Sequence, residues 1–176
     1  MSGPLDPVLA WYEMARDSLR IALRVVEKKI PKAITKKHAL HGLAPTDAAS
    51  RIKETEQELK NMAVVAMVAV FERVLREYLA DRVVPLLGAV DAFDQGVRDQ
   101  VAEDIEFWHI SARVIDKVFK HRVAGNLCGM IKQIIDYRNE VAHGHVRGKP
   151  PPAYADPVTA YQRLNAFLRD GGVIPP

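Results

Sequence analysis

An arginine, an asparagine and a histidine stand close together near the end of the last core helix that the sequence predicts. They are Arg138, Asn139 and His143. A guanidinium binds phosphate through a fork of N–H donors, an amide hydrogen-bonds phosphate or orients a ring, and an imidazole transfers protons near neutral pH. Phosphodiester cleavage without a metal needs positive charge at the phosphate and a proton carrier beside it. We therefore take these three as candidate catalytic residues.

The helix that carries them is expected to bury Arg138. Asn126 is the expected N-cap, and Gly144 is expected to end the helix in a left-handed conformation. Between them, residues of one stripe recur at alternating spacings of four and three: Leu127, Ile131, Ile134, Arg138 and Val141. Arginine is rarely placed on a buried stripe, so Arg138 needs a partner inside the fold.

Glu72 is the acidic residue that interrupts the apolar surface of an earlier helix, between Val68 and Leu75. A carboxylate in such a place also needs a partner. Two partners fit the pattern: Arg76, one turn further along the same helix, and Arg138. We class Glu72 as a support residue of the site.

The whole chain predicts an all-α fold, an up-and-down bundle of about five to seven helices. The first helix carries Tyr12, Leu19 and Val26 on one stripe, and Trp11, Ile21 and Val25 widen it, so we expect two neighbours for this helix. The second helix is polar as far as Lys60 and strongly apolar afterwards, which predicts the centre of the bundle. Helices are expected over 6–30, 46–84, 97–110, 111–121, 126–143 and 157–169, with N-caps at Asp6, Thr46 and Asp156.

Basic residues gather in the segment 111–121, opposite Val114, Ile115, Val118 and Phe119, which are expected to be buried. This basic face and two residues after the last core helix are candidates for RNA phosphate contact: Arg113, Lys117, Lys120, His121, Arg147 and Lys149. His109, beside Trp108, is interpreted as a histidine at the edge of the core. The lysines of the loop 31–45 form either a solvated loop or a phosphate-contacting arm.

Composition limits the classes of protein to which the chain can belong. The chain has 176 residues, 48% of them hydrophobic, and a net charge of +3, which is typical of one globular, mildly basic domain. Its single cysteine, Cys128, excludes a disulfide framework within the chain and a cysteine-built metal site, and is expected to be buried.

No metal or other cofactor is expected. The sequence contains neither a secretory signal nor an apolar run that could span a bilayer, so a cytoplasmic location without membrane contact is expected.

The arrangement Arg138-x4-His143, with Asn139 next to the arginine, Tyr137 before it and Phe71-Glu72 on an apolar helix upstream, resembles the signature of the HEPN superfamily. Many of these helical proteins are metal-independent ribonucleases of toxin–antitoxin and anti-phage systems. The resemblance extends from the first helix to Gly144. It implies RNA as substrate, attack by the 2′-hydroxyl, 2′,3′-cyclic phosphate products, a homodimer with a composite site, and an antitoxin protein as a further partner.

Position 145, close to the motif, affects what the resemblance implies in two ways. His145 fits the longer spacing that the family tolerates, so it is an alternative to His143 as the catalytic histidine. Family members paired with nucleotidyltransferase antitoxins often carry a modified tyrosine at this position, and that mode of silencing is not expected here. Glu140 and His145 are included as support residues.

The domain organisation expected is a HEPN-like bundle over 1–147, a Pro-rich linker over 148–156 and an appended helix over 157–176, packed on the bundle or on a dimer partner. The alternative function is a non-catalytic HEPN-like domain that binds RNA, nucleotide or a partner protein. An unrelated helical bundle is the third interpretation. A helix-turn-helix DNA reader is disfavoured because its second helix is too apolar to lie in a groove.

Overall fold

The structure is a computed structural model, and it describes residues 3–28, 38–82, 85, 88, 92–107, 109–144 and 153–175. These residues are mostly helical and contain no strand, which confirms the predicted all-α class. None of the described helices has the length and apolar character that crossing a membrane requires. The helical segments are α1 (Asp6–Glu27), α2 (Pro45–Arg82), α3 (Ala92–Phe107), a π-helix η3 (Ile110–Val118), a 3-10 turn η4 (Phe119–His121), α4 (Gly125–His143) and α5 (Pro157–Asp170).

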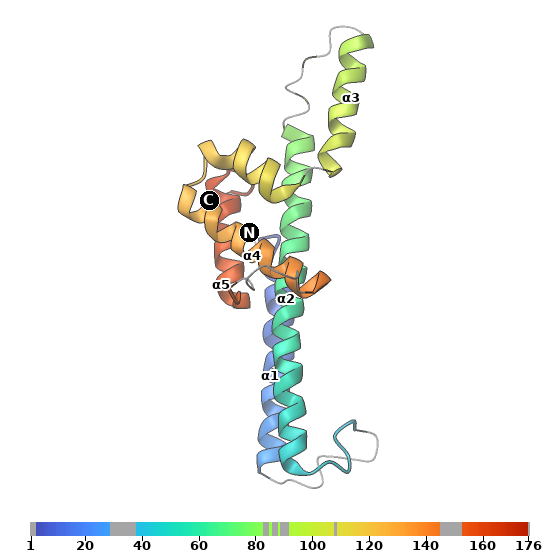
Figure 1. Cartoon of the computed structure of the whole chain (residues 1–176), viewed down its shortest axis with the longest axis vertical. Coiled ribbons are helices and arrows are strands. Elements are labelled where there is room, and N and C mark those ends of the chain that lie inside the picture. The colour runs from blue at the N-terminus through green and yellow to red at the C-terminus, as the bar shows by residue number, and fades with distance from the viewer. Residues whose placement is uncertain are drawn as a thin grey trace.

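Helix α2 is the axis of the molecule, and every other α-helix packs against it (Figure 1). α1 runs antiparallel along its first half, and the two form a long arm. α4 and α5 pack on its second half and form the body of the protein, while α3 lies beside its C-terminal end. This division follows from the sequence, because α2 is polar up to Lys60 and apolar beyond it.

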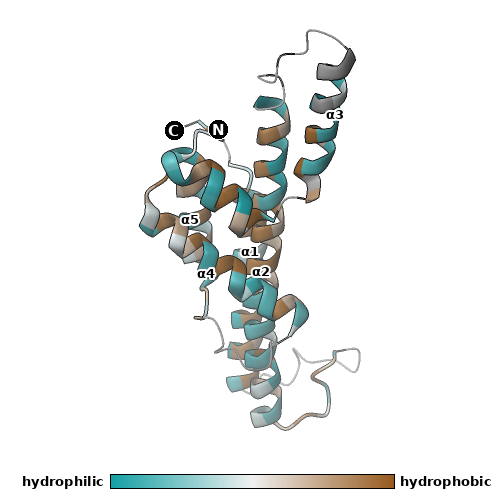
Figure 2. Cartoon of the chain, turned by 45° about the horizontal axis from the view of Figure 1, so that its top comes forward, coloured by the Kyte–Doolittle hydropathy of each residue, from teal (hydrophilic) through white to brown (hydrophobic). Residues whose placement is uncertain are grey.

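The main core fills the body, where hydrophobic surfaces of α2, η3, α4 and α5 meet (Figure 2). Three phenylalanine rings lie at its centre: Phe167 of α5 is 5.5 Å from Phe71 and 5.4 Å from Phe119, measured between ring centroids. The edge-to-face arrangement of Phe71 and Phe167 suits the positive edges and negative faces of aromatic rings. Cys128 is buried in the same core, as the sequence predicts.

The arm has a small core of its own near its tip. Val26 of α1 is buried there against Ala48 and Ile52 of α2, and partly buried leucines pack against these three residues. Among the described residues, the predicted second neighbour of α1 is missing from most of its length, since α1 packs on α2 and touches α5 only weakly. Trp11 and Ile21, which were expected to be covered, are 45% and 62% exposed.

Helix α5 forms a wall of the main core of its own chain. The Asp156 side chain caps it by accepting the Thr159 N–H at 3.0 Å, as the sequence predicts. Ala160, Leu164, Phe167 and Leu168 are buried. The sequence left open whether this helix packs on the bundle or on a second subunit. In this structure it packs on the bundle and is therefore an integral part of it.

Several helix boundaries differ from the expectation. Asp6, the expected N-cap of α1, is instead its first helical residue, and the fully buried Leu5 is at the N-cap. The Asp6 carboxylate accepts the Gly3 N–H at 2.5 Å. α3 begins at Ala92 rather than 97, since Gln95 and Asp99 hydrogen-bond one turn apart at 2.7 Å and Gly96 does not stop the helix. α4 begins at Gly125 without a side-chain cap.

The segment expected as an ordinary helix over 111–121 is a π-helix followed by a 3-10 turn. Its backbone hydrogen bonds have this longer period: the Val114 N–H donates to the His109 carbonyl at 3.5 Å, and the Phe119 N–H donates to the Val114 carbonyl, each five residues back. A π-helix brings residues five apart onto one face, whereas an α-helix brings together those three or four apart. The expectation that Val118 is buried was wrong, because the wider turn leaves it 37% exposed.

Candidate functional site

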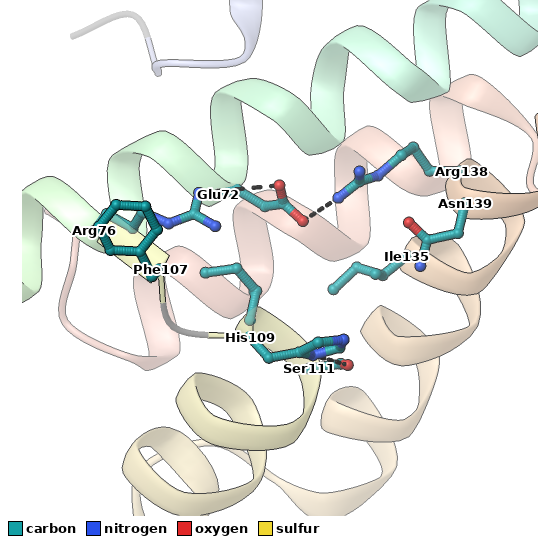
Figure 3. Close-up of a pocket in the computed structure, with 9 residues that line it drawn as sticks. Glu72, Arg76, Phe107, His109, Ser111, Ile135, Arg138 and Asn139 are labelled. Carbon is teal, nitrogen blue, oxygen red and sulfur yellow. Dashed lines mark hydrogen bonds and ion pairs between the residues drawn. The ribbon is translucent and has the colours of Figure 1, made fainter. Parts of the chain in front are cut away.

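A cleft of about 290 Å³ opens in the body where α2, α4 and the start of η3 meet. Two of the residues singled out from the α4 sequence, Arg138 and Asn139, line it. Figure 3 shows Glu72 and Arg138 on one side and His109 with Ser111 on the other. The full lining is Glu72, Arg76, Phe107, His109, Ile110, Ser111, Ile135, Arg138 and Asn139.

Glu72 holds two arginines of the cleft at once. Arg138 Nη2 donates a hydrogen bond to Glu72 Oε1, and Arg76 Nη1 lies 3.9 Å from Oε2 (Figure 3). Both partners that the sequence offered for Glu72 are therefore present. The side chains of Glu72 and Arg138 are only 15% and 20% exposed. Two guanidinium groups share one carboxylate, so this side of the cleft carries one excess positive charge.

The position of Arg138 is set by packing on both of its sides in α4. Ile134 and Ile135 are buried in the main core, and Tyr137 is 9% exposed. The Tyr137 hydroxyl donates to Asn61 Oδ1 of α2 at 2.6 Å, and burial raises the pKa of Tyr137. α4 therefore cannot rotate about its axis without breaking a buried contact, which keeps the guanidinium of Arg138 directed at Glu72.

His109 faces the arginine side of the cleft from the start of η3. Its Nδ1 accepts the Ala112 N–H at 3.4 Å and lies 3.1 Å from Ser111 Oγ, so the imidazole is the N-cap of this helix. With Nδ1 as acceptor, the proton of the neutral ring is on Nε2. The ring can then donate a hydrogen bond from Nε2.

His143, the predicted catalytic histidine, is exposed and does not line the cleft. It is the last residue of α4, one helical turn beyond Asn139. Gly144 ends the helix with the positive φ, +81°, that the sequence predicts, and its ψ of 170° lies outside the left-handed helical region. His143 therefore lies on the protein surface one turn away from the cleft.

The other predicted site residues are more scattered. Glu140 is half-buried on α4, and His145, Arg147 and Lys149 lie outside the described residues. Arg113, Lys117, Lys120 and His121 are all exposed along η3 and η4, the segment that begins at the cleft. In the described part of the chain, no three His, Cys, Asp or Glu side chains are grouped so that they could hold a metal ion.

His109 and Ser111 are the cleft residues that were not assigned to the site from the sequence. His109 was interpreted as an edge-of-core histidine, but its side chain is exposed in the cleft. The pattern His109-Ile110-Ser111 just before an apolar helix does contain a signal, because a polar side chain at that point caps the helix. Its closeness to α4 depends on tertiary packing.

The fold and the cleft thus define an all-α protein with a positively charged, histidine-containing cleft beside its central helix. No protein-family model matches the chain, and no curated protein or solved structure is similar to it at a significant level.

Proposed function

We propose that the protein is a metal-independent endoribonuclease of the HEPN type. The observation that supports this best is Arg138, held by Glu72 in an open cleft with Asn139 beside it and His109 opposite. A guanidinium fixed in this way presents its remaining donors in a constant direction, which suits the binding of a phosphodiester. The proposal includes a cytoplasmic location, a role in toxin–antitoxin or anti-phage defence, and an antitoxin partner, which only the sequence resemblance supports.

In the proposed reaction Arg138 and Asn139 hold the phosphate that is cleaved. One imidazole removes the proton of the 2′-hydroxyl, whose oxygen attacks phosphorus. The bond from phosphorus to the 5′-oxygen breaks, and a second imidazole protonates that oxygen, leaving a 2′,3′-cyclic phosphate and a 5′-hydroxyl. His109 in the cleft and His143 one turn beyond Asn139 are the two imidazoles that one chain offers.

The sequence resemblance suggests instead that two chains combine their histidines in a composite site. Mixing the inactive variants Arg138→Ala and His143→Ala distinguishes the two arrangements. A composite site assembled from two chains regains part of the activity in the mixture. A site built within one chain stays inactive, because neither variant contains a complete set of groups.

The test of the activity uses single-stranded RNA in the presence of a chelator. Wild type should cleave it, and Arg138→Ala, His143→Ala and His109→Ala should each lose about 10²-fold or more in rate. Arg73→Ala is the matched control, because Arg73 is an exposed arginine of the same helix as Glu72 and does not line this cleft. Absence of cleavage by wild type, or equal cleavage by all variants, would reject the ribonuclease proposal.

A non-catalytic RNA- or nucleotide-binding role is the second candidate, and one observation favours it. His143 is outside the cleft, so the cleft itself contains one imidazole, that of His109, whereas the proposed cleavage needs two, and Arg138 is already engaged by Glu72. This role predicts RNA binding that is weakened by Arg138→Ala while no product forms. Binding measured in parallel with cleavage therefore separates the two candidates.

A further inference from the structure

Helix α1 carries a second, mostly apolar stripe that the described part of its own chain leaves largely exposed. The stripe consists of Trp11, Met14, Ser18, Ile21 and Val25, at spacings of three, four, three and four. We call it the outer stripe. Met14 and Ile21 are 73% and 62% exposed, and Trp11 is 45% exposed. Large apolar side chains aligned in this way are uncommon on a free helix surface.

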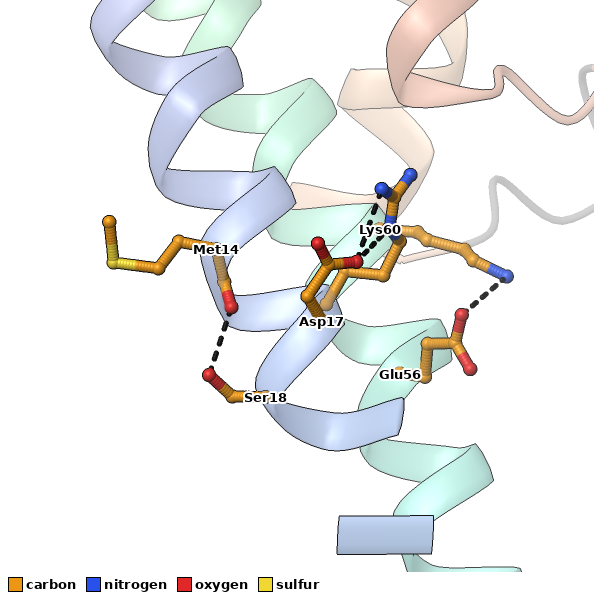
Figure 4. Close-up of polar contacts among 6 residues, drawn as sticks. Met14, Asp17, Ser18, Glu56 and Lys60 are labelled. Atoms are coloured by element: carbon orange, nitrogen blue, oxygen red, sulfur yellow. Dashed lines mark hydrogen bonds and ion pairs between the residues drawn. The ribbon is translucent and has the colours of Figure 1, made fainter. Parts of the chain in front are cut away.

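The outer stripe lies apart from the contact between α1 and α2. That contact uses Tyr12, Leu19 and Val26, one position further along the chain at each turn. Figure 4 shows Met14 and Ser18 projecting from the side of α1 that faces away from α2. Spacings that alternate between three and four are typical of the seam between two helices packed at a small crossing angle. α1 therefore has the surface for a second helical neighbour, which the described part of the chain does not supply.

We propose that this neighbour is α1 of a second copy of the chain, packed antiparallel. In an antiparallel pair, seam positions of the two types face each other across the interface. The facing pairs are then Met14 with the partner's Val25, Ser18 with the partner's Ile21, and Trp11 with the partner's Lys28. The last pair places the lysine stem and its charge against the indole ring.

The charges beside the outer stripe support this pairing. Asp17 and Arg24 occupy the flanking positions that precede Ser18 and Val25, and both are exposed. Asp17 forms an ion pair with Arg16 of its own chain at 3.3 Å, and its side chain is still 63% exposed. In the proposed register Asp17 lies beside the partner's Arg24, and Arg24 lies beside the partner's Asp17. Opposite charges at such flanking positions select helix partner and register.

Neighbouring registers are electrostatically unfavourable. A shift by one heptad in one direction places Asp17 beside the partner's Asp17, and a shift in the other direction places Arg24 beside the partner's Arg24. A parallel pair places Asp17 beside the partner's Ala22, where no charge compensates it. The self-complementary arrangement is therefore the antiparallel one, which a two-fold axis generates.

This pairing is independent of the proposed ribonuclease activity, because the outer stripe is on the arm and contains no residue of the cleft. The arm and the body lie along different parts of α2 (Figure 1). Two arms paired antiparallel place the two bodies at opposite ends, so each cleft keeps its own surroundings. A composite cleft from two chains would need a different contact.

Sedimentation of the full chain, followed into the high-micromolar range, tests the proposal. Wild type should form a two-chain species, and Ile21→Asp should weaken its association about tenfold or more by placing a charge in the seam. Asp17→Arg and Arg24→Asp should each weaken it, and the double variant Asp17→Arg/Arg24→Asp should recover it. Arg20→Asp, on the opposite exposed face of α1, is the matched control and should leave association unchanged.

The helical content of each variant, measured by circular dichroism, shows whether α1 stays folded. Three results would overturn the proposal: a wild type that sediments as a single chain at every concentration, a two-chain species that Ile21→Asp does not weaken, or a double charge variant that associates no better than the single ones. The last result rejects the antiparallel register in particular.

Discussion

Arg138 and Glu72 are 66 residues apart in the sequence, and a hydrogen-bonded ion pair joins them inside the body of the protein. The contact fixes the C-terminal half of α4 to the second half of α2. It also removes most of the water from both groups, since their side chains are 20% and 15% exposed. The same pair thus connects the stability of the bundle with the direction of the guanidinium in the cleft.

Removing one partner of this pair should destabilise the fold. We expect Arg138→Ala to lower the free energy of unfolding by about 1–3 kcal/mol, because the Glu72 carboxylate keeps only its longer contact with Arg76. Urea unfolding monitored by circular dichroism measures this loss. Arg73→Ala is the control: its ion pair with Glu77 is 67% and 63% exposed, so its loss should cost under about 1 kcal/mol. Equal effects of the two variants would contradict a structural role for the Arg138–Glu72 pair.

The close packing around Gly171 predicts that a substitution there also changes the stability of the fold. A Cβ at this position would lie 2.9 Å from Cε1 of Phe119 and 3.0 Å from the Phe167 carbonyl oxygen. Gly171→Ala should therefore lower the free energy of unfolding by about 1–3 kcal/mol. Gly129 in α4 is the matched control, because a Cβ there meets no atom within 4 Å. Gly129→Ala should raise the free energy of unfolding by about 0.5–1 kcal/mol.

How far the sequence predicts this fold is clearest in α4 and α5. The alternating stripe placed Arg138 on the inner face of α4, and Asp156-Pro157 located the start of α5, because both signals depend only on residues within one or two turns. The width of the apolar stripe also indicated that α1 has two neighbours. It could not indicate that, among the described elements, α2 alone packs along most of α1, because that depends on where the remaining helices pack.

The candidate site was only partly predictable for the same reason. Arg138, Asn139 and Glu72 could be proposed because they interrupt or flank a regular apolar pattern. His109 is in no such pattern, and its place in the cleft follows from the packing of η3 against α4. The π-helix was missed because the apolar residues of 110–119 were interpreted with the period of an α-helix.

The contact between Asp6 and Tyr161 predicts a pH dependence of stability. The Tyr161 hydroxyl donates to Asp6 Oδ1 at 2.6 Å, and this bond, followed by the Gly3 N–H, lowers the pKa of the Asp6 carboxyl below its ordinary value. A lowered folded-state pKa stabilises the protein above the ordinary pKa, and that stability is lost as the pH falls through the folded-state pKa.

Tyr161→Phe removes the largest cause of the lowered pKa, so it should reduce the free energy of unfolding at neutral pH. Its difference from wild type should shrink as the pH falls below about 4, where Asp6 becomes protonated in both proteins. Urea unfolding over a pH series measures the difference. Asp6→Asn provides the control, because it removes the titrating group and should make the Tyr161→Phe effect independent of pH in this range. If the difference in free energy of unfolding between wild type and Tyr161→Phe, both with Asp6 intact, stays constant down to low pH, this account is contradicted.

The exposed basic residues of η3 and η4 predict how RNA binding responds to salt. Lys117 and Lys120 are exposed on the segment that starts at the cleft, and each phosphate contact that they make releases counterions. Each substitution by alanine should weaken RNA binding and reduce the slope of log K against log salt by about 0.7 for a single strand. Lys53→Ala is the matched control, because Lys53 is an exposed lysine of α2 on the arm, away from the cleft. If Lys53→Ala reduces the slope as much as Lys117→Ala does, the charge of the whole chain attracts RNA and the basic face has no special role.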